Sequence, residues 1–203
     1  MRRGGDGELI MPSLFFITHP EVVIDPAIPV PEWSLSELGR ERMNAFAKTA
    51  LLNQVSAVYA SSERKAIDGG EIIAAYRGLT IKIDPALGEN DRSATGYVAP
   101  PEFWDIVAEF FARPNESIRG WERAADAQKR IVGAVERIAE QEPTSGDIAI
   151  VSHGGVGCLL MAHLKGASSA LDCKPPHPGG GCFFVMDRAT LTPISNWRVV
   201  EDA

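Results

Sequence analysis

Two short, almost purely apolar runs restrict the fold of this chain more than any other feature of its sequence. Residues 14–17 read Leu-Phe-Phe-Ile, and residues 148–152 read Ile-Ala-Ile-Val-Ser. Runs of this length are typical of strands, and a strand without polar alternation is typical of a parallel sheet that is covered on both faces. Further strands are expected at 55–60, 79–83, 182–186 and 194–200.

Helical patterns lie between these strands, with apolar residues at helical spacing and recognisable start and stop signals. The expected helices cover about 36–52, 62–76, 102–111, 121–141 and 156–163. The alternation of strands and helices predicts an α/β fold, a three-layer sandwich with a mostly parallel central sheet flanked by helices. The 203 residues suffice for one domain, expected at 11–203, with residues 1–10 as a disordered N-terminal extension.

The charge of the chain argues against nucleic acid as a partner. There are 20 Lys and Arg against 27 Asp and Glu, a net charge of -7, whereas a surface that binds nucleic acid usually has a basic excess. No apolar run approaches the roughly 18 residues of a membrane helix, and the first ten residues lack the apolar core of a signal peptide. The odd number of cysteines, 3, favours free thiols and a cytoplasmic location, with no membrane partner.

Two histidines follow two of the expected strands directly. His19 comes after the first apolar run and is followed by Pro20, and His153 comes after the 148–152 run and is followed by Gly154. Ligands of open parallel sheets bind beyond the carboxyl ends of the strands. One such histidine would more often only terminate a strand, but two at equivalent positions indicate a shared site.

The remaining histidines and the cysteines could suggest a zinc site. These residues are Cys158, His163, Cys173, His177 and Cys182. Their spacings match no common pattern of zinc ligands, and Cys158 lies on an apolar helix. We therefore expect neither a metal nor a cofactor.

Five segments, in order along the chain, resemble the motifs of one known family. They are Phe-Ile-Thr-His-Pro-Glu at 16–21, Leu-Ser-Glu-Leu-Gly-Arg at 35–40, Tyr-Ala-Ser-Ser-Glu-Arg-Lys-Ala at 59–66, Leu-Gly-Glu at 87–89 and Val-Ser-His-Gly-Gly at 151–155. On these segments the chain resembles the histidine phosphatases, also called the phosphoglycerate mutase-like superfamily, over about 14–185. The 59–66 segment is one residue shorter than its counterpart in the family.

The resemblance implies a mechanism and a role for each matching residue. His19 would be the nucleophile that attacks a phosphoryl group and forms a phosphohistidine. Glu89 would protonate the leaving oxygen and then help to activate water. His153 would hold the phosphoryl oxygens together with cations and backbone amides, among them that of Gly154. No metal takes part in this scheme.

The opening motif departs from the family pattern at two positions. Thr18 stands where the family has an arginine, and Pro20 stands where it has a glycine. Thr18 offers phosphate a hydroxyl but no charge and no bidentate fork. Because a hydrogen bond to a charged group contributes about 1.5–3 kcal/mol, the loss would lower the rate about ten- to a hundredfold or more.

Three cations are candidates for the remaining phosphate contacts. The second arginine of the family aligns with Lys65 if Ala66 is the anchor, or with Arg64 if Ser62 is. Arg92, three residues after the expected acid, would compensate for the missing arginine if it turned into the site, and is otherwise a solvated loop charge. Ser62 is either a helix cap, which is the commoner role, or a phosphate ligand at a helix start.

These observations leave two hypotheses. The first is a phosphatase acting on a small phosphorylated metabolite or a phosphohistidine protein, preferred to a mutase because the chain is short and its opening motif is degraded. The second is a catalytically impaired relative that binds a phosphorylated ligand or protein partner, which the residues at positions 18 and 20 suggest. The substrate would be chosen by the 84–101 loop and the 102–120 segment.

Overall fold

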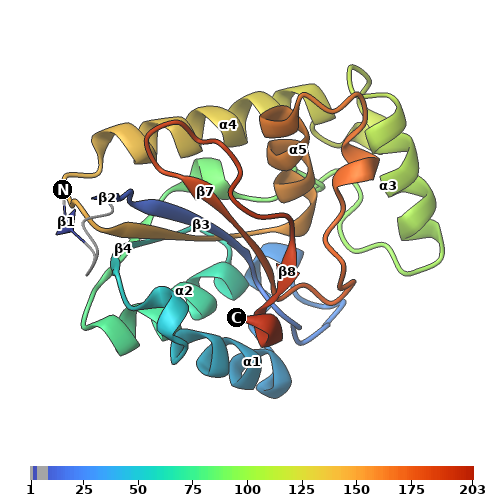
Figure 1. The fold of residues 1–203 in the computed structure, drawn as a ribbon. Helices are drawn as coiled ribbons and strands as arrows, with labels where there is room; N and C mark the ends of the chain where they lie inside the picture. Colours follow the sequence, from blue (N-terminus) through green and yellow to red (C-terminus); the bar gives the residue numbers. More distant parts are fainter. Residues whose placement is uncertain (1, 4–8) are drawn as a thin grey trace.

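The computed structural model describes residues 2–3 and 9–203 and shows an α/β fold (Figure 1). Its six-stranded sheet has the strand order β5-β4-β6-β3-β7-β8. The strands are β3 (Ser13–Thr18), β4 (Val55–Ala60), β5 (Ile81–Ile83), β6 (Asp147–Ser152), β7 (Cys182–Asp187) and β8 (Arg198–Val199). The α-helices of the described residues are α1 (Glu37–Ala47), α2 (Arg64–Arg77), α3 (Glu102–Ala112), α4 (Ala124–Gln141) and α5 (Gly154–Lys165). The predicted fold class is confirmed.

The sheet is mixed but mostly parallel, as its sequence patterns predict. β5, β4, β6 and β3 run parallel to one another, whereas β7 pairs antiparallel with β3 and β8 pairs antiparallel with β7. The two apolar runs form β3 and β6, which lie side by side at the centre, and five of the six residues of each are buried. This central position explains their lack of polar alternation.

Helices cover both faces of the sheet and make the predicted three layers (Figure 1). Successive side chains of a strand point to opposite faces, so Phe15 and Ile17 pack on the α1–α2 side and Leu14 and Phe16 on the α4–α5 side. Their partners on the helices include Met43, Phe46 and Ile73 on the first side, and Ile131, Val135, Leu159 and Leu160 on the second. Burying one such side chain contributes about 1.5–3 kcal/mol.

Some element boundaries differ from the predictions. The first helix ends at Ala47 and is followed by a separate short turn, instead of continuing to about residue 52. Its start is confirmed, because the Ser36 hydroxyl accepts a hydrogen bond from Gly39 N at 3.1 Å. The apolar spacing of this helix also predicts Leu38 on the buried face with Met43 and Phe46; that prediction is wrong for Leu38, which is 54% exposed.

The expected N-terminal extension lies partly outside the described residues. Arg2–Arg3 forms β1, which pairs antiparallel with β2 at Leu9–Ile10. Residues 1 and 4–8 lie outside the described part of the chain. Within the described part, no helix is long and apolar enough to cross a membrane.

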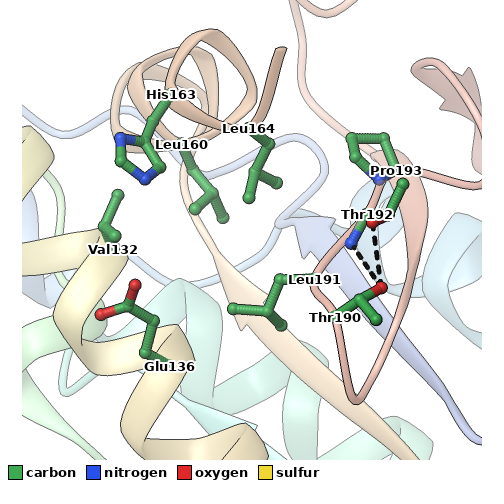
Figure 2. Close-up of a pocket in the computed structure, with 9 residues that line it drawn as sticks. All are labelled: Val132, Glu136, Leu160, His163, Leu164, Thr190, Leu191, Thr192 and Pro193. Carbon is green, nitrogen blue, oxygen red and sulfur yellow. Dashed lines mark hydrogen bonds between the residues drawn. The ribbon is translucent and has the colours of Figure 1, made fainter. Parts of the chain in front are cut away.

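A pocket of about 270 Å³ lies between α4, α5 and the turn that follows β7 (Figure 2). Leu160, Leu164 and Leu191 supply much of its lining, and His163 stands at its edge. Neither of the two histidines that follow β3 and β6 lines this pocket.

Candidate active site

His19 and His153 come together because they follow adjacent parallel strands. Thr18 of β3 is in register with Ser152 of β6, and the His19 N–H donates to the carbonyl of Ser152 at 3.0 Å. The two imidazole rings meet edge to face, with their centroids 5.2 Å apart. Sheet pairing alone therefore brings both histidines to one point at the carboxyl edge.

His19 is held in the form that a nucleophile needs. Its Nδ1 lies 2.8 Å from the carbonyl oxygen of Pro20, and because a carbonyl only accepts, Nδ1 carries the proton and Nε2 keeps its lone pair. Burial, His153 and Lys65 lower the pKa of His19 to about 3. The ring is therefore neutral at physiological pH.

A glycine-rich turn closes over the backbone of His19. The N–H of Gly181 donates to the carbonyl of His19 at 3.1 Å. At Gly180, φ is +76°, and a Cβ there would lie 2.0 Å from the carbonyl oxygen of His19. Only glycine fits such a conformation and approach, so this turn packs directly against the backbone of the site.

His153 is almost fully enclosed, with 1% of its surface exposed. Its Nε2 lies 2.7 Å from the hydroxyl of Ser61 and 3.3 Å from Oε1 of Glu63. Its Nδ1 has no hydrogen-bond partner among the described residues. Burial lowers the pKa of His153, and the two carboxylates of Glu63 and Glu89 only partly oppose this.

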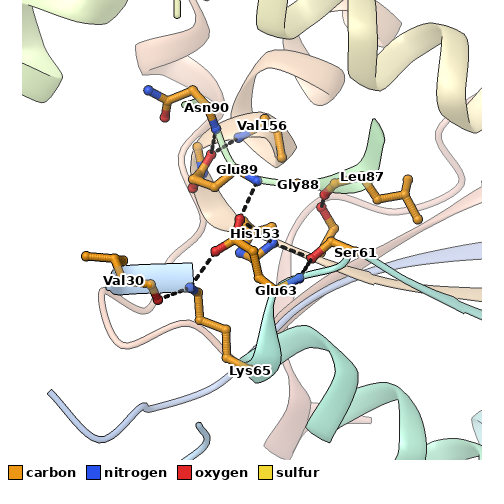
Figure 3. Close-up of polar contacts among 12 residues, drawn as sticks. Val30, Ser61, Glu63, Lys65, Leu87, Gly88, Glu89, Asn90, His153 and Val156 are labelled. Carbon is orange, nitrogen blue, oxygen red and sulfur yellow. Dashed lines mark hydrogen bonds and ion pairs between the residues drawn. The ribbon is translucent and has the colours of Figure 1, made fainter. Parts of the chain in front are cut away.

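The carboxylate of Glu89 lies at the start of α5, directly after His153 (Figure 3). It accepts hydrogen bonds from Gly155 N at 2.9 Å and Val156 N at 3.0 Å. Burial raises the pKa of Glu89, but Arg92, His153 and the Gly155 amide together hold it below its usual value. The group is therefore ionised at neutral pH, in the favourable field of a helix N-terminus.

Of the two alignments for the phosphate-binding cation, the structure brings Lys65 to the site. Lys65 is 5% exposed, and its Nζ donates to the carbonyl of Val30 at 2.8 Å and to Oε2 of Glu63 at 2.5 Å (Figure 3). It is also one of the charges that lower the pKa of His19. A buried cation thus stands beside both histidines.

Comparison with known proteins places this arrangement in a family. Residues 28–179 match the histidine phosphatase superfamily (branch 1). The chain belongs to the histidine phosphatase superfamily. The match starts at residue 28, after the 16–21 segment.

Several solved structures have a similar fold, and some of them bear the names of phosphatases. The mycobacterial glucosyl-3-phosphoglycerate phosphatase has a TM-score of 0.69 and 21% identity, covering 92% of this chain and 96% of that one. Bacillus stearothermophilus YhfR has a TM-score of 0.72 and 23% identity, covering 89% and 93%. The α-ribazole phosphatase from Shigella flexneri has a TM-score of 0.65 and 20% identity, covering 92% and 95%. At these identities the likeness is one of fold, and no curated protein matches the sequence.

Thr18, the last residue of β3, bonds to the backbone of the neighbouring strand β7. Its hydroxyl accepts a hydrogen bond from Cys182 N at 3.0 Å and lies 3.3 Å from the carbonyl oxygen of Cys182, to which it donates. With 1% of its surface exposed, this residue ties β3 to β7. The structure does not bring the Thr18 hydroxyl into the site as the expected phosphate ligand.

Two other expected ligands lie on the surface. The side chain of Arg64 is 51% exposed and pairs with Asp68 at 2.7 Å, one turn further along α2. Ser62 is exposed and does not cap α2, because Glu63 is the N-cap residue. Gly154, by contrast, is the first residue of α5 and lies beside His153.

Arg92 lies at the edge of the site. Its Nη2 is 3.3 Å from Oε2 of Glu89, and its guanidinium stacks over the rings of Phe103 and Trp121 at 5.2 and 5.0 Å. Its charge also lowers the pKa of His153. Of the two interpretations of Arg92 from the sequence, this geometry favours the functional one over a solvated loop charge.

The sequence patterns did not point to Glu63 and Arg130, which organise the site. Oε1 of Glu63 accepts a hydrogen bond from Glu89 N at 2.8 Å. Although burial raises its pKa, His153 and Lys65 lower it to about 2. The one sequence feature that could have pointed to Glu63 is the 59–66 segment, which is one residue shorter than its counterpart in the family. The missing residue changes which side chains lie just before Lys65.

Arg130, from the middle of α4, holds the loop that carries Glu89. Its guanidinium donates to the carbonyls of Ala86 and Gly88 at 2.9 Å and of Glu89 at 3.1 Å. Glu122 pairs with it at 2.7 Å and fixes its orientation. An arginine on a helix surface carries no sequence signal of this kind, so only the tertiary structure reveals the role.

Proposed function

We propose that this chain is a phosphatase that hydrolyses a phosphomonoester or a phosphohistidine through a phosphohistidine intermediate on His19. The observation that carries the proposal is the state of that imidazole. Nδ1 is engaged by the carbonyl of Pro20 at 2.8 Å, the pKa is lowered to about 3, and Nε2 therefore holds an available lone pair at neutral pH.

In the first step, Nε2 of His19 attacks phosphorus, a P–N bond forms, and the bond to the leaving oxygen breaks. Glu89 donates the proton that the leaving oxygen needs. Although the pKa of this carboxyl is low in the free protein, a phosphoryl group bound beside it adds negative charge and raises the pKa. In the second step, Glu89 accepts a proton from a water whose oxygen bonds to phosphorus, the P–N bond breaks, its electron pair returns to Nε2 of His19, and phosphate leaves.

The charge of the phosphoryl oxygens would be held by His153, Lys65 and Arg92, with the backbone amide of Gly154. Lys65 supplies a point charge in place of the fork of an arginine. Two structural neighbours bear the names of phosphatases of small phosphorylated compounds, glucosyl-3-phosphoglycerate and α-ribazole phosphates. They support a small phosphorylated metabolite over a phosphorylated protein as the substrate class.

A second candidate function is that of a catalytically impaired relative that binds a phosphorylated ligand or protein. The observation in its favour is that Thr18 is committed to Cys182, while Lys65 and Arg92 already pair with carboxylates. Under either function we place the protein in the cytoplasm, because its three cysteines are free thiols, which suit a reducing compartment.

Turnover of p-nitrophenyl phosphate by the wild type and by His19→Ala tests the proposal. We expect the variant to lose activity by on the order of a thousandfold or more, because no other group replaces the nucleophile. His163→Ala is the matched control, since that histidine lies at the separate pocket (Figure 2).

An acid-labile phosphoenzyme should form on the wild type and on the His163→Ala control but not on His19→Ala. A phosphoenzyme that persists in His19→Ala would refute the assignment of the nucleophile. Absence of turnover over a broad panel of phosphomonoesters, with retained phosphate binding, would instead favour the binding function.

A further inference from the structure

The carboxylate of Glu63 is bound as an anionic ligand would be. Its Oε2 accepts from Lys65 Nζ at 2.5 Å, its Oε1 accepts from Glu89 N at 2.8 Å, and Oε1 also lies 3.3 Å from Nε2 of His153 (Figure 3). Two donors, Lys65 Nζ and Glu89 N, and the imidazole of His153 thus converge on one side chain from three segments. Such convergence on an anion from a lysine, an imidazole and a backbone amide is the pattern of a phosphate-binding site.

We infer that the Glu63 carboxylate occupies the phosphoryl position of the site, and that a phosphate must displace it in order to bind. This inference rests on the proposed function, in which Lys65 and His153 hold the phosphoryl oxygens. Glu63 then acts as a competitor that is part of the chain, and it sets the affinity of the site for phosphate.

The charges around the histidines agree with this role. Lys65 and Arg92 are matched by Glu63 and Glu89, with ion pairs of 2.5 and 3.3 Å. Phosphate that entered beside the resident carboxylate would meet a like charge close by, which disfavours both groups in one place. Displacing Glu63 removes this repulsion and frees Lys65 for the incoming anion.

The position of Glu63 in the chain allows such a displacement. It is the N-cap residue of α2 with extended backbone dihedrals, and its side chain makes no capping hydrogen bond with the helix. It follows the exposed Ser62 and is itself 12% exposed at the side chain. The side chain can therefore turn towards solvent without unwinding α2.

The alternative role for Glu63 is to position Lys65, and the two roles predict opposite effects. If the carboxylate only orients Lys65, its removal weakens phosphate binding. If it competes with phosphate, its removal strengthens binding. Isothermal titration of inorganic phosphate into the protein separates these outcomes, and it needs no turnover.

The variant Glu63→Gln removes the charge and keeps an oxygen that can accept from Glu89 N. We expect it to bind inorganic phosphate about ten- to a hundredfold more tightly than the wild type. This factor corresponds to the free energy that one charged hydrogen bond contributes. Glu32→Gln is the control for a general charge effect, because Glu32 is an exposed residue near Val30. We expect that control to change the affinity by less than about twofold.

Glu63→Ser provides a second variant that favours folding, since serine is a good N-cap residue. It should also bind phosphate more tightly than the wild type. A gain of at least fivefold in either folded variant supports the inference, and a smaller gain or a loss overturns it. If a variant binds phosphate more tightly but neither it nor the wild type turns over substrate, the inference stands and the proposed catalysis fails. If the wild type turns over substrate but neither variant binds phosphate more tightly, the proposed catalysis stands and the inference fails.

Discussion

His19 and His153 follow two paired strands, whereas Glu63 and Lys65 lie at the start of a helix, and different forces hold the two pairs. The backbone of each histidine is placed by the register of β3 on β6 and by the hydrogen bond from His19 N to Ser152. Lys65 and Glu63 are placed by long-range polar contacts to Val30 and Glu89. The histidine side of the site (His19 and His153) therefore depends on the fold of the sheet. The helix side (Glu63 and Lys65) depends on the balance of charges.

Among variants that keep His19, the largest effect should come from changing the helix side, which consists of Glu63 and Lys65. We expect Lys65→Met to lower kcat/KM by about ten- to a hundredfold, because a charged hydrogen bond to phosphate is lost. Arg64→Met, next in the chain but half-exposed and paired with Asp68, is the matched control and should stay within about twofold of the wild type. Steady-state kinetics of both variants checks this, and a stronger loss in the Arg64 variant would reverse the assignment of the cation.

A smaller effect, on stability alone, is expected at the end of β3. Thr18→Val removes the hydroxyl that bonds both backbone groups of Cys182. Leaving those buried groups without a partner should reduce the free energy of unfolding by about 1–3 kcal/mol. Urea denaturation measures this loss, and phosphate titration should show an affinity within about twofold of the wild type. A large loss of phosphate affinity would show that Thr18 serves the site directly.

A different kind of effect is a pH dependence of stability that His19 produces. Its folded pKa is about 3, below its ordinary value of 6.5, so the unfolded chain binds a proton that the folded one does not. Stability is therefore complete above about pH 6.5 and is lost as pH falls towards 3. The slope from this group is at most about 1.4 kcal/mol per pH unit.

Urea denaturation between pH 7 and 4 should show a steeper fall of stability for the wild type than for His19→Ala. The difference between the two proteins isolates His19, because Glu63, Glu89 and His153 also have shifted pKa values. Equal slopes would contradict a neutral imidazole with a lowered pKa at position 19.

Much of the histidine side could be predicted from the sequence. The apolar runs located β3 and β6, and the residue after each run had to lie at the carboxyl edge, where the structure places His19 and His153. The helix side could be predicted only in part. The alignment left Arg64 and Lys65 equivalent, and only the structure shows that they differ in burial, since Lys65 is 5% exposed while the side chain of Arg64 is 51% exposed.

The sequence by itself determined the α/β fold, its mostly parallel sheet and the meeting of two histidines. The spacing of apolar residues along the chain decides which segments form strands and helices, and this spacing is a local property of the sequence. Only the tertiary structure decided that Thr18 bonds to Cys182, that Arg130 holds the Glu89 loop, and that a carboxylate lies between Lys65 and His153. These contacts join residues far apart in the chain, and the direction of each side chain depends on partners that no local pattern encodes.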